Sequence, residues 1–306
     1  MINLQKKVSF IGNLDSTIVL NVYSDKIRVF KTDLSLKKLD TVLLKFPSSF
    51  NTTINIYKDI DPFNVYCSNP LGDITVFNGL DVGSYKVRDA IIDRFVAVST
   101  KTIIARARHN YDKESNRAFV KLKLSDKMIT NKRYSLPKQE NGFFANDGQL
   151  SYDHKNGRLL YMYFYRGEFL CLDTNLNLLY KGKSIDTVTS VKIKTAIINL
   201  KATKTGGSIK QITQASPPSV VSRYMTVSSG RLYILSALKS DKEKPATFAT
   251  NHAVDVYDLK NGRYLHSFYI PKYKGIKLNQ FQIKGKSLIG IYDTELVCYD
   301  FIEKRI

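Results

Sequence analysis

Lysine side chains gather in two segments of the 306-residue chain, and they are its clearest candidates for binding chemistry. Residues 181–210 hold seven lysines and a single acidic residue, Asp186, and the segment "LKSDKEKPATFATNH" (238–252) adds three more lysines. Ammonium groups at this density attract carboxylates and phosphates. They predict a docking surface for an anionic ligand or an acidic partner. The alternative is a pair of solvated loops without a partner, and the flexible composition of "TKTGGS" (203–208) fits both interpretations.

The tripeptide "YRG" (165–167) could extend this surface. Its arginine lies at a turn tip, where it could meet an anion, and its tyrosine could stack on a sugar or a base. The predicted ligand- or partner-binding residues are Tyr165, Arg166, Lys192, Lys194, Lys201, Lys204, Lys239, Lys242 and Lys244.

Patterns for catalysis or metal binding are missing from the sequence. The four histidines stand at no metal-ligand spacing, and the three cysteines form no CxxC pair, which favours buried packing thiols. There is no GxSxG motif, no phosphate-binding loop and no nucleotide fingerprint. We therefore expect no catalytic residue, no metal and no cofactor.

The net charge of +20 widens the choice of partners. Such a surface attracts polyanions in a salt-dependent way, so nucleic acid is a possible partner. Lysine outnumbers arginine, however, whereas base readout and bidentate phosphate contacts use arginine preferentially. Nucleic acid is therefore not the favoured partner. A lysine-rich solvated surface without a specific partner is the alternative.

Short apolar-alternating phrases recur along the chain and predict the elements that carry these residues. "IRVF", "ITVF", "FVKLKL", "FLCLD", "VDVYD" and "LVCYD" are six versions of one strand. Around the fourth version, residues 149–182 divide into strands at Gln149–Asp153, Leu159–Phe164, Glu168–Asp173 and Leu178–Tyr180. Asn156–Gly157 is a strong hairpin signal. Five aspartates that stand where a strand enters a turn are expected to cap those turns, namely Asp153, Asp173, Asp258, Asp293 and Asp300.

Six such units predict an all-β fold, a six-bladed β-propeller with four antiparallel strands in each blade. We expect one domain over residues 1–306, with long insertions at about 183–220 and 238–252. A β-sandwich is the alternative, but it would not explain the regular return of one phrase. The N-terminal "NLQKKVSF" is expected to run beside the short final strand "IEKRI" and to close the ring.

Three longer stretches carry a resemblance to a known group of proteins. "RLLYMYFYRGEFLCLDTNLNLLYKGKSIDT", "ASPPSVV" and "NHAVDVYDLKNGRYLHSFYIP" resemble uncharacterised six-bladed β-propeller proteins of Bacteroidetes-type bacteria. The resemblance implies the fold and an extracytoplasmic setting, periplasmic, secreted or membrane-anchored, through a leader that this chain lacks. It brings no catalytic residues. The alternative is a cytoplasmic protein, and we expect a monomer.

In a propeller, the connections between second and third strands, and those between blades, emerge on one face. This loop face would carry residues 109–116, 137–148, 165–167, 183–220 and 238–252. We therefore predict a non-catalytic module that docks a protein or an anionic ligand on the loop face, around the central channel. The alternative is a metal-dependent hydrolase or lactonase with its site at the channel mouth. It would need several inner-strand carboxylates, and only Asp93 and the nearby Asp147 are available.

Overall fold

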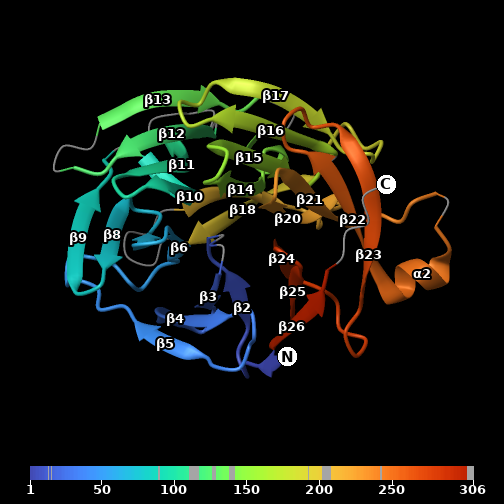
Figure 1. Ribbon diagram of the computed structural model, residues 1–306. Coiled ribbons are helices and arrows are strands. Elements are labelled where there is room, and N and C mark those ends of the chain that lie inside the picture. Colours follow the sequence, from blue (N-terminus) through green and yellow to red (C-terminus); the bar gives the residue numbers. More distant parts are fainter. Residues whose placement is uncertain are drawn as a thin grey trace.

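Six four-stranded antiparallel sheets surround a central axis in the computed structural model of the chain (Figure 1). The predicted six-bladed β-propeller is confirmed, and helix is almost absent from the described residues. The structure describes residues 1–12, 14, 16–88, 90–109, 117–125, 129–137, 142–191, 193–201, 208–241 and 243–301.

The first three blades follow one another along the chain, each from its inner to its outer strand. The strands of blade 1 are β2 (Val8–Phe10), β3 (Thr17–Val22), β4 (Asp25–Asp33) and β5 (Asp40–Leu43); those of blade 2 are β6 (Tyr57–Ile60), β7 (Val65–Ser68), β8 (Asp73–Asn78) and β9 (Asp81–Lys86); those of blade 3 are β10 (Ala90–Ser99), β11 (Thr102–His109), β12 (Ala118–Lys123) and β13 (Ile129–Ser135).

The remaining blades repeat the pattern, except that blade 6 takes its outer strand from the start of the chain. The strands of blade 4 are β14 (Gly148–Asp153), β15 (Arg158–Tyr163), β16 (Glu168–Asp173) and β17 (Leu178–Lys183); those of blade 5 are β20 (Ser222–Ser228), β21 (Arg231–Ser236), β22 (Asn251–Asp258) and β23 (Tyr264–Pro271); those of blade 6 are β24 (Gln280–Lys284), β25 (Ser287–Tyr292), β26 (Glu295–Asp300) and β1 (Ile2–Asn3).

Blade 4 shows how local sequence forms these strands. Its first turn contains Gly157 at φ 60°, a conformation that glycine adopts without steric cost. The turn is capped by Asp153, whose carboxylate accepts hydrogen bonds from the Lys155 backbone N–H at 3.1 Å and from the Asn156 side chain at 2.6 Å. Asp173 and Asp258 accept backbone N–H groups in the same way. These three aspartates therefore serve their turns, as predicted.

The hydrophobic core lies between the blades and not at the axis. Each of the six clusters found among the described residues joins two adjacent blades. In β15, Tyr161 and Tyr163 pack against blade 3, while Leu160 and Met162 pack against blade 5. The period of two in a strand places alternate side chains on opposite faces, so both faces of a central strand become buried.

The N-terminal strand closes the ring, by a different pairing from the expected one. Ile2 of β1 pairs with Leu296 of β26, and Asn3 pairs with Glu295. The Leu4 N–H then donates to the Thr294 carbonyl at 2.9 Å. β1 is thus itself the fourth strand of blade 6. The "IEKRI" segment expected in that place (302–306) lies outside the described residues.

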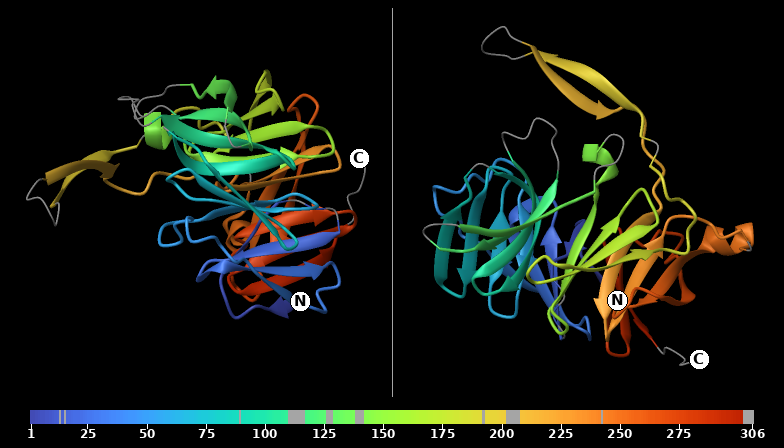
Figure 2. Two further views of the ribbon diagram at one scale, coloured as in Figure 1. Left: turned by 90° about the vertical axis from the view of Figure 1, so that its left-hand side faces the viewer. Right: turned by 90° about the horizontal axis from the view of Figure 1, so that it is seen from above.

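Both long insertions contain regular structure. Within 183–220, β18 (Thr195–Lys201) and β19 (Ser208–Gln214) pair with each other and with no other strand that the structure describes. This hairpin, the arm, projects from the loop face, on the same side as the short α1 (Gly142–Ala145) (Figure 2). Within 238–252, α2 (Pro245–Thr250) lies at the outer edge of blade 5 (Figure 1). No helix in the described part of the chain is long and apolar enough to cross a membrane.

Removing Met1–Lys6 should lower the melting temperature by several degrees. The deletion takes β1 from blade 6 and Leu4, which is 6% exposed, from the cluster between blades 6 and 1. Losing one buried leucine side chain costs about 2–5 kcal/mol. Scanning calorimetry would measure the effect. Lys7→Ala, which removes only an exposed ion pair with Asp293, is the control. An unchanged melting curve for the deletion would contradict a closing role for β1.

Candidate functional site

The central channel holds a cavity of about 550 Å³. Side chains from the inner strands of all six blades line it, because each inner strand turns one edge toward the axis. The volume is that of a small-molecule pocket. The charged lining groups are Lys26, Lys58, Asp59, Arg94 and Arg223, together with the titratable His154.

Several polar groups of the lining are occupied in joining one blade to the next. The Gln149 side chain accepts the Met225 N–H at 2.8 Å and donates to the Met225 carbonyl at 3.0 Å, which joins blades 4 and 5. Gln280 accepts the Phe10 N–H at 2.8 Å across the closure from blade 6 to blade 1. Such groups satisfy backbone atoms that no ladder reaches. They are structural and are not free to hold a ligand.

Asp59 has the same joining role in a buried position. Its carboxylate accepts the Ala97 N–H of blade 3 at 2.6 Å, and Ile60 and Gly12 N–H groups also contribute. Burial is the larger effect and raises the pKa of Asp59 to about 7.

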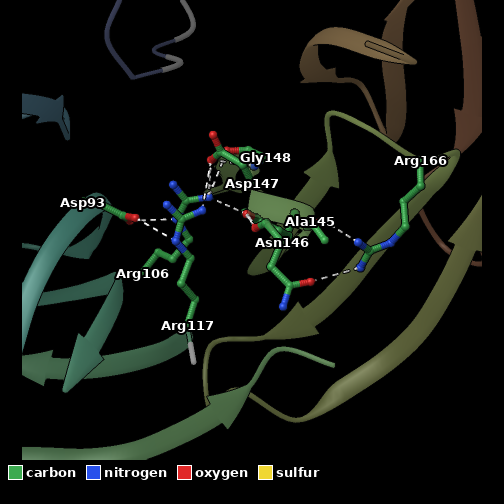
Figure 3. Close-up of polar contacts among 9 residues, drawn as sticks. Asp93, Arg106, Arg117, Ala145, Asn146, Asp147, Gly148 and Arg166 are labelled. Carbon is green, nitrogen blue, oxygen red and sulfur yellow. Dashed lines mark hydrogen bonds and ion pairs between the residues drawn. The ribbon is translucent and has the colours of Figure 1, made fainter. Parts of the chain in front are cut away.

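Asp93 and Asp147, the carboxylate pair noted in the sequence, do converge, but around two arginines (Figure 3). The Arg106 Nε lies 2.7 Å from Asp93, and its Nη1 lies 2.9 Å from Asp147. Arg117 approaches the same two carboxylates at 3.2 and 3.3 Å. Burial alone would raise the pKa of Asp147, but the guanidiniums outweigh it and lower that pKa.

These contacts decide what the carboxylate pair can do. Its oxygens face cationic groups, and a metal ion would have to displace them. In the described part of the chain, no group of three or more His, Cys, Asp or Glu side chains could hold a metal. The pair therefore gives no support to the hydrolase or lactonase alternative. It joins blades 3 and 4.

Arg166 lies in the interior, at 1% exposure, and not on the exposed surface. Its guanidinium donates to Glu168 at 2.8 Å and to the Ala145 carbonyl at 2.7 Å, and it stacks 3.2 Å from the centre of the Tyr163 ring. Figure 3 shows it reaching back toward the segment that precedes β14. Its contacts hold the 164–167 turn in place, and they leave only the half-buried Tyr165 of the tripeptide near solvent.

The 164–167 turn anchors both segments that connect the arm to the ring. The Gly167 N–H donates to the Val188 carbonyl at 2.8 Å on the outgoing side, and the Val221 N–H donates to the Phe164 carbonyl at 2.8 Å on the returning side. A Cβ at Gly167 would collide with the Ser184 hydroxyl oxygen, so only glycine allows this approach. The turn that carries Tyr165 therefore meets the two segments that lead to and from the arm, at one place on the loop face.

The predicted lysines divide into two groups. Lys194 is exposed at the base of the arm, where its carbonyl accepts the Ala215 N–H, and Lys201 ends β18. Lys239 and Lys244 are exposed in the connection that leads to α2. The arm and α2 lie well apart in both figures, so the two insertions do not form one continuous patch (Figures 1 and 2). Lys192, Lys204 and Lys242 lie outside the described residues.

Sequence reasoning missed the arm as a hairpin, although a signal existed. "TAIINLK" and "SIKQITQ" are β-prone runs on either side of a Gly-Gly turn sequence. It also missed the Arg106 and Arg117 partners of the carboxylate pair. For those no local signal exists, because Arg106 and Asp147 are brought together only by the packing of two blades.

Comparison with known proteins supports the fold alone. No family model and no curated protein matches the chain. A member of the DUF4221 family from Bacteroides vulgatus is similar in structure, with a TM-score of 0.60 at 10% identity, over 94% of this chain and 87% of that one. BamB from Moraxella catarrhalis gives a TM-score of 0.44 at 12% identity, over 95% and 83% of the two chains.

Arg166→Met should destabilise the protein by about 2–4 kcal/mol, because it breaks a buried ion pair and leaves Glu168 and two other acceptors without their donor. Urea unfolding would measure the loss. Arg133→Met on the exposed side of β13 is the matched control and should change little. Equal stability of the two variants would show that the Arg166 contacts do not hold the turn.

Asp59 should make stability depend on pH. Its folded-state pKa of about 7 exceeds the ordinary value of 3.8, so the folded protein holds the proton more tightly and loses stability as the pH rises between these values. The unfolding free energy of the wild type, relative to Asp59→Asn, should therefore fall from about pH 5 to about pH 8. Urea titrations at both pH values would measure it.

The exposed Asp241→Asn variant, measured at the same two pH values, serves as the control for the loss of one carboxylate. If the difference in unfolding free energy between the wild type and Asp59→Asn is the same at both pH values, Asp59 does not titrate in this range.

Proposed function

We propose that this β-propeller is a non-catalytic binding module that docks an acidic protein, or an anionic ligand, on its loop face. The arm is the observation that carries the proposal. It is a two-stranded ribbon that stands clear of the ring, and such ribbons are marginally stable alone in water. Contact with another molecule would therefore stabilise the arm by burying its exposed surface.

The arm exposes apolar side chains next to positive charge. Ile197 is 67% exposed and Ile198 is 41% exposed, on opposite faces of β18. Ile197 pairs with Ile212 across the hairpin. The segment 181–210 carries seven lysines and one aspartate, and of these lysines Lys194 lies at the base of the arm and Lys201 ends β18. A partner with an acidic surface would satisfy the lysines, while its contact covers the isoleucines.

The proposed docking residues are those of the arm and its surroundings. Tyr165 lies at the anchoring turn, and Arg166 supports that turn from inside. The α2 connection offers a second, separate contact area on blade 5. The proposed contact residues are Tyr165, Lys192, Lys194, Lys201, Lys204, Lys239, Lys242 and Lys244.

We further propose that the protein works as a monomer outside the cytoplasm, either in the periplasm, secreted or anchored to a membrane. The likeness of its strand and turn phrases to Bacteroidetes-type propeller proteins supports this placement. Fractionation of the native cells and light scattering of the purified protein would check the two parts of the proposal.

Replacing Lys192, Lys194, Lys201 and Lys204 with serine should weaken binding of poly-L-glutamate about tenfold. Each exposed charge pair contributes about 0.2–1 kcal/mol, and a tenfold change corresponds to about 1.4 kcal/mol. Fluorescence anisotropy with labelled poly-L-glutamate at two salt concentrations would measure it, with duplex DNA as a second probe.

The matched control removes four exposed lysines from turns on the opposite face, with the same loss of charge. These are Lys37, Lys101, Lys155 and Lys260. Equal weakening in both variants would show that the overall charge drives binding and not the arm. Tighter binding of DNA than of poly-L-glutamate, lost in the arm variant alone, would instead favour nucleic acid as the partner.

A further inference from the structure

Two arginines of the channel lining have no counter-charge among the residues that the structure describes. Arg94 of β10 and Arg223 of β20 both line the central cavity. Within the described residues, neither guanidinium has a hydrogen bond or an ion pair. β10 and β20 belong to blades 3 and 5, so the two arginines flank β14 on the inner wall.

The other positive groups of the lining are occupied. Lys26 Nζ donates to the carbonyls of Thr52, Thr53 and Ile54, at 2.9, 2.9 and 2.8 Å. Lys58 Nζ donates to the Arg28 carbonyl at 3.1 Å. The arginines are therefore the cations of the described lining that remain available to a ligand.

Acidic groups do not neutralise these arginines. The positive charge of Arg94 helps to lower the pKa of Asp147. Arg106 and Arg117, however, already pair with Asp147 and Asp93. Three guanidiniums thus share two carboxylates and leave one positive charge in excess. The acidic residue of the cavity lining, Asp59, is buried and turned toward backbone N–H groups. The cavity is therefore positive, and a channel with low-dielectric walls concentrates such a field.

A β-bulge turns Arg223 out of the regular ladder. On β20, Ser222 pairs with Ser236 and Tyr224 pairs with Leu235, so Arg223 is the extra residue of the bulge. β10 has a bulge at the corresponding place, where Asp93 is the extra residue directly before Arg94. Bulges re-aim side chains and are common beside functional sites. Burial without a carboxylate partner lowers the pKa of Arg223, although a guanidinium stays protonated in water. Its charge is thus partly desolvated and uncompensated.

We propose that Arg94 and Arg223 form a binding site in the central channel for a small molecule that carries carboxylate or phosphate groups. Planar guanidiniums bind both groups through paired N–H donors. The 550 Å³ cavity has room for a small metabolite. Tyr57 and Tyr224, which also line it, offer aromatic faces and hydroxyl groups. This site is separate from the arm, and it does not depend on the docking of a protein.

Calorimetric titration with citrate and with inorganic phosphate, each at low salt, tests the site in the full chain. We expect at least one of them to bind with a dissociation constant below about 1 mM. Arg94→Gln/Arg223→Gln should weaken that binding at least tenfold. Arg133→Gln/Arg263→Gln, which removes two exposed arginines of the same blades outside the channel, is the matched control and should bind as the wild type does.

The melting temperature without ligand separates binding from folding. Because Arg94 and Arg223 stabilise no partner in the described structure, their double variant should melt at the wild-type temperature or above. Replacing residues 195–214 of the arm with Gly-Ser-Gly should leave citrate or phosphate binding intact, which distinguishes this site from the docking surface. The proposal is wrong if neither anion binds, if the control pair loses binding equally, or if the channel variant melts at a lower temperature.

Discussion

The inner edges of six sheets meet at one axis, and the backbone groups on those edges have no neighbouring strand. A buried N–H or C=O without a partner costs as much as a lost hydrogen bond, so a ring of this kind must supply partners from side chains. Gln149, Gln280 and Asp59 do this between different pairs of blades. The polar character of the channel thus has a structural origin first, and only the side chains left over are available for ligands.

The blade faces present the complementary problem, which apolar contacts solve. Each sheet is too small to bury its two faces by itself, and every cluster found among the described residues spans a junction between blades. Stability is then distributed around the ring, since each junction supports its two neighbours. A ring of this kind also has to be closed, and β1 does so by completing blade 6 with residues from the other end of the chain.

The sequence predicted the repeated parts of this fold closely. The predicted bounds of the blade 4 strands differ from the observed ones by at most one residue, except at the end of β17, where they differ by three. The agreement is close because period-two alternation and the Asn156–Gly157 turn are local signals. Features that depend on contacts beyond one hairpin were not accessible. Arg166 was expected at a surface because it follows a strand end, yet the Ala145 carbonyl and Glu168 hold it inside. The division of the lysines between the arm and α2 likewise follows from three-dimensional placement that spacing does not encode.

The way the arm is attached has a mechanical consequence. The two segments that connect it to the ring are held by hydrogen bonds to one short turn, and the Ile185 N–H additionally donates to the Tyr257 hydroxyl of blade 5 at 3.0 Å. A force applied to the arm would therefore reach the ring at the seam between blades 4 and 5, through these connecting segments. A molecule held by the arm would load that seam before any other junction of the ring.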